Sequence, residues 1–101
     1  MVLWLLGPKV YRGELPPKIT INNVLPGFTD TERLSSLQKA RANREGVSPD
    51  KVHQNWLSQV PEGRLARPQE TAKAVCFLTS EDASYIRGVS LAVDGGRLRS
   101  I

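Results

Sequence analysis

The chain has 101 residues, of which 40% are apolar and 24% are charged, an ordinary composition for a single globular domain. This length excludes a complete doubly wound nucleotide-binding sheet and most enzymes that need two domains. The formal net charge is +4, from 14 Lys and Arg against 10 Asp and Glu.

The basic residues are scattered singly along the chain, and acids stand among them, as in Glu32-Arg33 and Arg44-Glu45. The densest cluster is the pair Arg97 and Arg99, and no aromatic residues are interleaved with basic ones. A nucleic-acid binder normally concentrates positive charge in a patch or stripe. We therefore expect no nucleic-acid partner, and a small basic nucleic-acid binder is the least favoured functional hypothesis.

The chain has one cysteine, Cys76, and one histidine, His53, so it offers neither an internal disulfide nor a zinc-binding spacing. The apolar run Met1–Leu6 is too short for a secretory signal or for a spanning helix, which needs about 20 residues. We expect a cytoplasmic chain without a metal site or membrane partner. His53 is expected to be a solvated helix residue.

The first strand is predicted over Ile19–Leu25, where β-branched residues are frequent and Pro26-Gly27 ends the run. The run lacks clean alternation, which is typical of a parallel strand covered on both faces. Before it, residues 1–18 are interrupted by Gly and Pro, so we expect an irregular N-terminal segment.

Two helices are predicted next. Thr29–Thr31 is a cluster of N-cap residues, and behind it Leu34, Leu37 and Ala40 step at helical spacing to about Asn43. In the second helix Ser48 caps, Pro49 takes the first position, and Asp50 meets the positive end of the dipole. Its apolar face is expected to hold Val52, Trp56 and Leu57.

A third helix opens at Arg67–Glu70, again with proline at the first helical position. Its predicted apolar face holds Ala72, Val75, Cys76 and Thr79, with Leu78 beside it and Cys76 as a small buried residue. A second strand follows over Val89–Val93 and ends at Asp94–Gly96, where Asp94 is expected to be a turn residue. The long helical connection favours a parallel pair of strands with a right-handed crossover.

Four segments, in order and at matching spacings, resemble the C-terminal part of the short-chain dehydrogenases/reductases. They are the Pro-Gly-x-x-x-Thr motif of residues 26–31, Gly63-Arg64 with Arg67–Ala72, Phe77–Ser80 with Ala83–Ile86, and Gly88-Val89 with Val93–Gly96. Within this family, the sequences of the four segments are most similar to the 3-oxoacyl carrier-protein reductase-like branch. The resemblance implies an α/β fold: the C-terminal portion of a Rossmann-like doubly wound parallel sheet, with two strands and about three to four helices, incomplete as a domain.

The resemblance also implies three divisions of the chain. Residues 1–18 loosely resemble the end of the helix that precedes this region in the family. Residues 19–96 correspond to the C-terminal part of the dehydrogenase domain, and residues 97–101 form a tail. Within residues 19–96, the segment from residue 32 to about residue 60 matches the mobile lid that covers substrate in the family.

The catalytic features of the family are missing from these 101 residues. There is no Gly-rich turn of the kind that cradles a pyrophosphate at a helix start. The family's Tyr-x-x-x-Lys is also missing, because Leu15 follows Tyr11 at that spacing and Val89 follows Tyr85. We therefore assign no catalytic residue.

The resemblance does imply part of a cofactor site. In the family the loop after this strand runs past the nicotinamide of NAD or NADP. By position Pro26 and Gly27 end the strand, Thr29 offers backbone groups to the carboxamide, and Thr31 offers its hydroxyl. Taken without the family, Pro26-Gly27 reads as a strand terminator and Thr29–Thr31 as a helix cap.

Two functional hypotheses stand above the nucleic-acid one. The first is the C-terminal segment of an NAD(P)-dependent oxidoreductase acting on a small carbonyl or alcohol substrate, inactive alone. The second is an interaction fragment that forms a homo-oligomer or pairs with a full-length relative, since two parallel strands leave open edges and apolar faces. The isolated chain is expected to be loosely folded or to need a partner.

Overall fold

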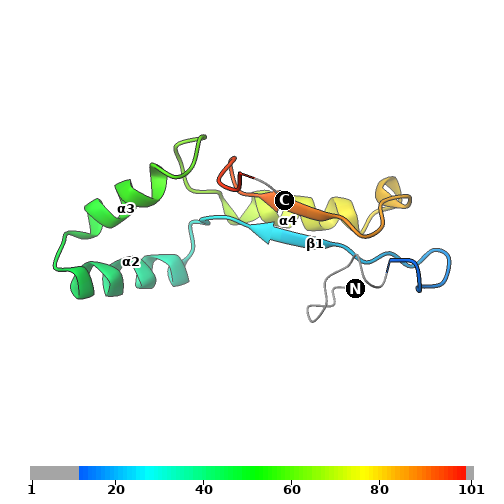
Figure 1. Ribbon diagram of the computed structural model, residues 1–101, viewed down its shortest axis with the longest axis horizontal. Coiled ribbons are helices and arrows are strands. Elements are labelled where there is room, and N and C mark those ends of the chain that lie inside the picture. Colours follow the sequence, from blue (N-terminus) through cyan, green and yellow to red (C-terminus); the bar gives the residue numbers. More distant parts are fainter. Residues whose placement is uncertain (1–11, 100–101) are drawn as a thin grey trace.

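The computed structural model describes residues 12–99, which contain a two-stranded parallel sheet and the helices that connect its strands (Figure 1). Strand β1 spans Asn23–Pro26 and strand β2 spans Ser90–Val93, in a register that runs from Asn23↔Ser90 to Pro26↔Val93. The parallel pairing predicted from the long crossover is confirmed. The connecting elements are α2 (Glu32–Glu45), α3 (Pro49–Leu57), α4 (Pro68–Leu78) and the short 3-10 helix η1 (Glu81–Ala83).

The molecule has two regions at opposite ends of a long body. At one end β1, β2 and α4 lie together, and we call them the sheet layer; at the other, residues 32–60 form a hairpin of α2 and α3, which we call the lid (Figure 1). The radius of gyration is 16.6 Å, against about 13 Å expected for a compact domain of this length. The lid therefore projects from the sheet layer.

Strand β1 begins at Asn23 and not at the predicted Ile19. The residues just before β1 hydrogen-bond to the residues just before β2, and these bonds lie outside the regular ladder. The Gly88 N–H donates to the Ile21 carbonyl oxygen at 2.8 Å. The buried Asn22 amide accepts from the Val89 N–H at 2.9 Å and donates to the Ile86 carbonyl oxygen at 3.3 Å. These bonds satisfy the buried polar side chain of Asn22, and Ile21 beside it is completely buried.

Residues 12–18 are irregular, as predicted, and the Arg87 guanidinium donates to the Leu15 carbonyl oxygen. The apolar run Met1–Leu6 and Tyr11 lie outside the described residues. Within residues 12–99, none of the helices has the length and apolar character needed to cross a bilayer.

The predicted starts of α2 and α3 are confirmed by their caps. The Thr31 hydroxyl accepts from the Leu34 N–H at 3.2 Å, and the Ser48 hydroxyl accepts from the Lys51 N–H at 3.2 Å. Pro49 occupies the first turn of α3. Helix α2 ends at Gly46, whose φ of 68° is the left-handed conformation that glycine adopts without strain.

The lid has its own apolar core, formed where α2 and α3 face each other. It consists of the buried Ala42, Val52 and Trp56, with Phe28, Leu34 and Val47 packed against them. The expected inward face of α2 is only partly right, because Leu37 is 52% exposed and Ala40 is also exposed. The partner helix covers a narrow stripe of α2, and these residues lie outside it.

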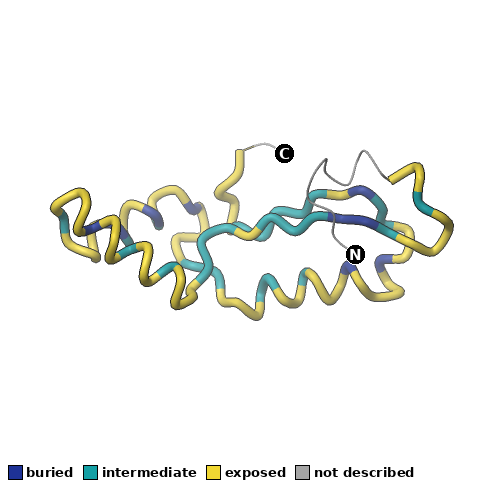
Figure 2. The backbone as a smooth tube through the Cα atoms, turned by 90° about the horizontal axis from the view of Figure 1, so that it is seen from below, coloured by how far each residue is buried: buried dark blue, intermediate teal, exposed yellow. Residues whose placement is uncertain are grey.

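The predicted buried face of α4 is wrong. Ala72, Cys76 and Thr79 are exposed, and Val75 is 42% exposed. The more buried positions of α4 are Thr71, Ala74 and Leu78, and Figure 2 shows much of the helix in solvent. Helix α4 carries small and apolar residues on two sides, and the sheet covers only one of them. Helical spacing alone did not reveal which side.

Candidate cofactor site

The predicted cofactor residues lie in one loop, residues 26–31, at the carboxyl end of β1; we call it the cofactor loop. The Gly27 N–H donates to the Val93 carbonyl oxygen at 3.0 Å, which brings the loop against the end of β2. A Cβ on Gly27 would lie 2.8 Å from the Cα of Asp94, so this approach requires glycine. In open α/β sheets, ligands bind beyond the carboxyl ends of the strands.

Thr29 is held by a parallel bridge to Ala66. The Ala66 N–H donates to the Phe28 carbonyl oxygen at 2.9 Å, and the Asp30 N–H donates to the Ala66 carbonyl oxygen at 2.8 Å. This pattern turns the N–H and C=O of Thr29 itself away from Ala66. Among residues 12–99, neither group takes part in a backbone hydrogen bond, so both are available to a ligand.

The hydroxyls of the two threonines make local bonds. The Thr29 hydroxyl donates to the Gly27 carbonyl oxygen at 3.1 Å, which closes the loop on itself. The exposed Thr31 hydroxyl accepts the helix-cap bond from Leu34. Since a hydroxyl has both a donor and acceptor sites, Thr31 caps α2 and keeps its own hydrogen for another partner.

The segment that carries Ala66 is fixed by an arginine–carboxylate pair that sequence reasoning missed. The two terminal nitrogens of Arg64 donate to the two carboxylate oxygens of Glu70 at 2.7 and 2.9 Å, and the Arg67 N–H also donates to Glu70 at 2.9 Å. These bonds, with Arg64 first, lower the pKa of Glu70 to about 2. A bidentate pair of this kind is planar and directional, so it orients the start of α4 beside the cofactor loop.

Asp94 is a turn residue, as predicted. Its carboxylate accepts from the Gly96 N–H and from the Leu98 N–H, each at 2.9 Å. These bonds hold the pKa of Asp94 below its ordinary value, with the Leu98 bond first. Within the described part of the chain, no group of three or more His, Cys, Asp and Glu side chains could hold a metal ion.

Aromatic contacts join the cofactor loop to the lid, and these were also missed. The ring of Phe28 stacks on Trp56 of α3, with 5.3 Å between centroids and 18° between planes. The guanidinium of Arg97 lies 4.4 Å from the centroid of Phe28. The available signal was an aromatic residue between Gly27 and Thr29, but the sequence did not specify its partners.

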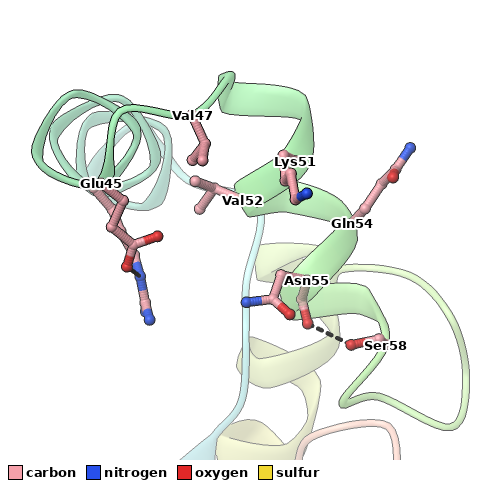
Figure 3. Close-up of a pocket in the computed structure, with 8 residues that line it drawn as sticks. Glu45, Val47, Lys51, Val52, Gln54, Asn55 and Ser58 are labelled. Carbon is pink, nitrogen blue, oxygen red and sulfur yellow. Dashed lines mark hydrogen bonds and ion pairs between the residues drawn. The ribbon is translucent and has the colours of Figure 1, made fainter.

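A shallow groove of about 330 Å³ lies between the end of α2 and α3 (Figure 3). It is lined by Arg41, Glu45, Val47, Lys51, Val52, Gln54, Asn55 and Ser58. The Ser58 hydroxyl donates to the Asn55 carbonyl oxygen at 2.7 Å, and Arg41 pairs with Glu45 at 2.9 Å. None of the predicted cofactor residues lines this groove, and His53, which is half-buried on α3, does not line it either.

Comparison with known proteins gives a consistent result for most of the chain. The model of the enoyl-(acyl carrier protein) reductase family matches residues 13–97. The chain is 36% identical over 86 residues to the NADPH-dependent reductase BacG of Bacillus subtilis, covering 85% of this chain and 33% of that protein. It is 45% identical over 78 residues to the 3-oxoacyl-(acyl-carrier-protein) reductase FabG of Salmonella typhimurium, covering 77% and 28%.

Solved structures agree in fold. YwfH, an NADPH-dependent reductase involved in bacilysin biosynthesis, superposes with a TM-score of 0.82 at 34% identity, covering 93% of this chain and 36% of that one. A short-chain dehydrogenase family protein from Francisella tularensis gives 0.81 at 33% identity, covering 89% and 38%.

The α/β fold and the matched segments place the chain in a class of oxidoreductases. The chain belongs to the short-chain dehydrogenase/reductase family, among the members similar to 3-oxoacyl carrier-protein reductases. It spans between 27% and 33% of the length of the first curated relatives that it matches.

Proposed function

We propose that this chain provides the nicotinamide-side loop and the substrate lid of an NADPH-dependent oxidoreductase, which transfers a hydride between the nicotinamide and a carbonyl or alcohol carbon of a small substrate. The observation that carries the proposal is the position of Thr29: its N–H and C=O are turned away from Ala66 at the carboxyl end of β1. The relatives named as NADPH-dependent favour NADPH over NADH.

The cofactor loop fits a nicotinamide chemically. The carboxamide of that ring has a donor and an acceptor, which complement the C=O and N–H of Thr29, and the Thr31 hydroxyl adds a donor. When bound, the nicotinamide supplies or accepts the hydride. Pro26 and Gly27 place no bulky side chain at the strand end, and the lid excludes water from the substrate.

We also propose that the chain alone does not catalyse the reaction. The 101 residues include no Tyr-x-x-x-Lys, which the family uses as its general acid/base, and Tyr85 is exposed. They include no Gly-rich pyrophosphate turn either. The one exposed cysteine, Cys76, is compatible with the reducing cytoplasm that we propose as its location.

A chimera tests the proposed role of the loop and lid. The 78-residue segment of the Salmonella typhimurium reductase that aligns with this chain is replaced by the matching residues of this chain. We expect the chimera to retain NADPH-dependent carbonyl reduction. Thr31→Ser keeps both the cap and the hydroxyl donor and leaves the KM for NADPH unchanged, whereas Thr31→Asp keeps the cap but has no hydrogen to donate and raises that KM. A folded chimera without any reduction contradicts the proposal.

The incompleteness of the site is tested on the chain itself. NADPH and NADH are titrated with the purified chain while nicotinamide fluorescence is followed. We expect no tight, saturable binding, because the pyrophosphate has no cradle in these residues. Tight binding by a monomer would show that the site is complete.

A second candidate function is pairing with a full-length relative or a second copy. One outward stripe of α4 supports it, because Val75 is 42% exposed and the exposed Ala72 and Cys76 adjoin it at helical spacing. An exposed apolar patch of this kind is typical of an interaction surface. Size-exclusion chromatography with a full-length family member tests this: we expect co-elution, and Val75→Glu abolishes it while the exposed Lys73→Glu on the same helix does not. Separate elution of the unmodified chain contradicts the pairing.

A further inference from the structure

Three side chains from segments far apart in the sequence form one stack. Phe28 comes from the cofactor loop, Trp56 from α3 in the lid, and Arg97 from the segment after β2. Phe28 lies in the middle, 5.3 Å from the Trp56 ring and 4.4 Å from the Arg97 guanidinium carbon. Trp56 is only 5% exposed, so the stack begins in the lid core and ends at the surface.

The backbone of Arg97 is fixed by the turn that precedes it. The Asp94 carboxylate accepts from the N–H groups of Gly96 and Leu98, the residues on either side of Arg97. The Arg97 N–H donates to the Asp94 carbonyl oxygen at 3.2 Å. Three bonds to one residue therefore hold the turn that presents the guanidinium to the ring.

The same turn is in contact with the segment where the lid ends. The Glu62 N–H donates to the Gly95 carbonyl oxygen at 3.1 Å. A Cβ on Gly95 would lie 2.8 Å from a methyl carbon of Val60, and the φ of Gly95 is 63°. The turn thus touches the lid at its exit, while Arg97 reaches the cofactor loop at the lid's entry.

We propose that Arg97 is a positioning residue for the lid. Its guanidinium holds Phe28 against Trp56, and this stack fixes α2 and α3 relative to the cofactor loop. A guanidinium is attracted to the negative face of an aromatic ring, and offset aromatic rings attract each other. The role of the lid over substrate rests on the proposed function, but the fixing of the lid does not depend on a cofactor.

A distance measurement on the full chain tests this proposal. Cys76 is the one cysteine of the sequence and is exposed on α4, so it takes a spin label directly. Lys39→Cys adds a second label on the exposed side of α2. Double electron–electron resonance then reports how firmly the lid is held relative to the sheet layer. We expect the distance distribution in this labelled parent to be clearly narrower than in variants that lack the stack.

Arg97→Gln should broaden that distribution, and Arg97→Lys, which keeps the positive charge, should restore most of the narrow peak. Arg99→Gln is the matched control, two residues further along the same segment, and should leave the distribution unchanged. Phe28→Leu retains apolar bulk without the ring and should broaden the distribution like Arg97→Gln. Circular dichroism should show the same helix content in all four variants.

The proposal is overturned if the Arg97→Gln distribution matches that of the parent, if Arg99→Gln broadens it equally, or if the parent is already as broad as Arg97→Gln. A loss of helix in Arg97→Gln also counts against it, because a positioning contact at the surface should leave the helices intact. The distance measurements need no cofactor. They can therefore contradict the role of Arg97 while the chimera remains active, and they can support that role while the chimera is inactive.

Discussion

The lid and the sheet layer are built from similar numbers of apolar residues but are stabilised differently. In the lid, α2 and α3 enclose Ala42, Val52 and Trp56 between them, and both helices have side-chain caps. In the sheet layer, the strands are mostly half-buried, and the helix beside them leaves its outer side in solvent (Figure 2). A parallel sheet is normally covered on both faces and has more than two strands.

This contrast indicates which region of the chain can keep its fold without further strands. A helical hairpin satisfies its backbone hydrogen bonds within each helix and needs only one apolar seam. A two-stranded sheet leaves one edge of each strand without a neighbouring strand. We therefore expect the lid to keep its structure, while the sheet layer depends on further strands from this or another chain of the family.

The largest expected effect is on the lid core. Trp56→Ala removes the side chain at its centre and the partner of Phe28, and should cost about 3–5 kcal/mol of unfolding free energy. Leu91→Ala in β2, where the leucine is only half-buried, should cost clearly less. Urea unfolding followed by circular dichroism measures both. Equal losses would mean that the two regions share one core.

The junction between the regions gives the next effect. Gly27→Ala places a Cβ 2.8 Å from the Cα of Asp94, and such overpacking against backbone costs about 1–3 kcal/mol. Gly13→Ala is the control, because nothing lies within 4 Å of its added Cβ. Thermal unfolding should separate the two variants. If both melt like the parent chain, the close approach of the strand ends is incorrect.

The cap of α2 gives a smaller effect, confined to the lid. Thr31→Ala removes the acceptor for the Leu34 N–H and should cost about 1 kcal/mol. Thr31→Ser should restore nearly all of it. Helix content and urea midpoint measure the change. No difference between Ala and Ser at this position would show that the cap does not stabilise the lid.

The smallest effect belongs to Glu70, which is at the surface of the sheet layer. Its pKa is lowered from 4.5 to about 2, so the bonds from Arg64 and Arg67 stabilise the folded chain above pH 4.5. That contribution is lost as the pH falls from 4.5 towards 2. Glu70→Gln should therefore be less stable than the parent at neutral pH, and the gap should close over that range. A gap that does not depend on pH would indicate a packing effect.

Local signals in the sequence predicted much of the fold. Helix starts depend on neighbouring residues only, so the sequence predicted them directly. The examples are the caps at Thr31 and Ser48 and the prolines that begin α3 and α4. The parallel pairing followed from the length of the crossover. Family resemblance supplied the cofactor loop, and its residues remain a prediction.

Long-range contacts could not be read from the sequence. The helical spacing of Cys76 predicts a buried residue, but its burial depends on whether a neighbour covers that side of α4, and Cys76 is exposed. Residues 97–101 are predicted only as a tail, yet Arg97 lies over Phe28 because a turn after β2 directs it there. Neither contact leaves a periodic or local signal.

Residue-resolved amide hydrogen exchange of the purified chain tests the contrast between lid and sheet layer most directly. We expect slow exchange for the core-facing amides of α2 and α3, including those of Ala42, Val52 and Trp56. We expect faster exchange for the ladder amides of β1 and β2, which become protected when a full-length family member is added. Slow exchange in both regions of the chain alone would contradict the proposed difference in stability, as would a lid that exchanges faster than the sheet.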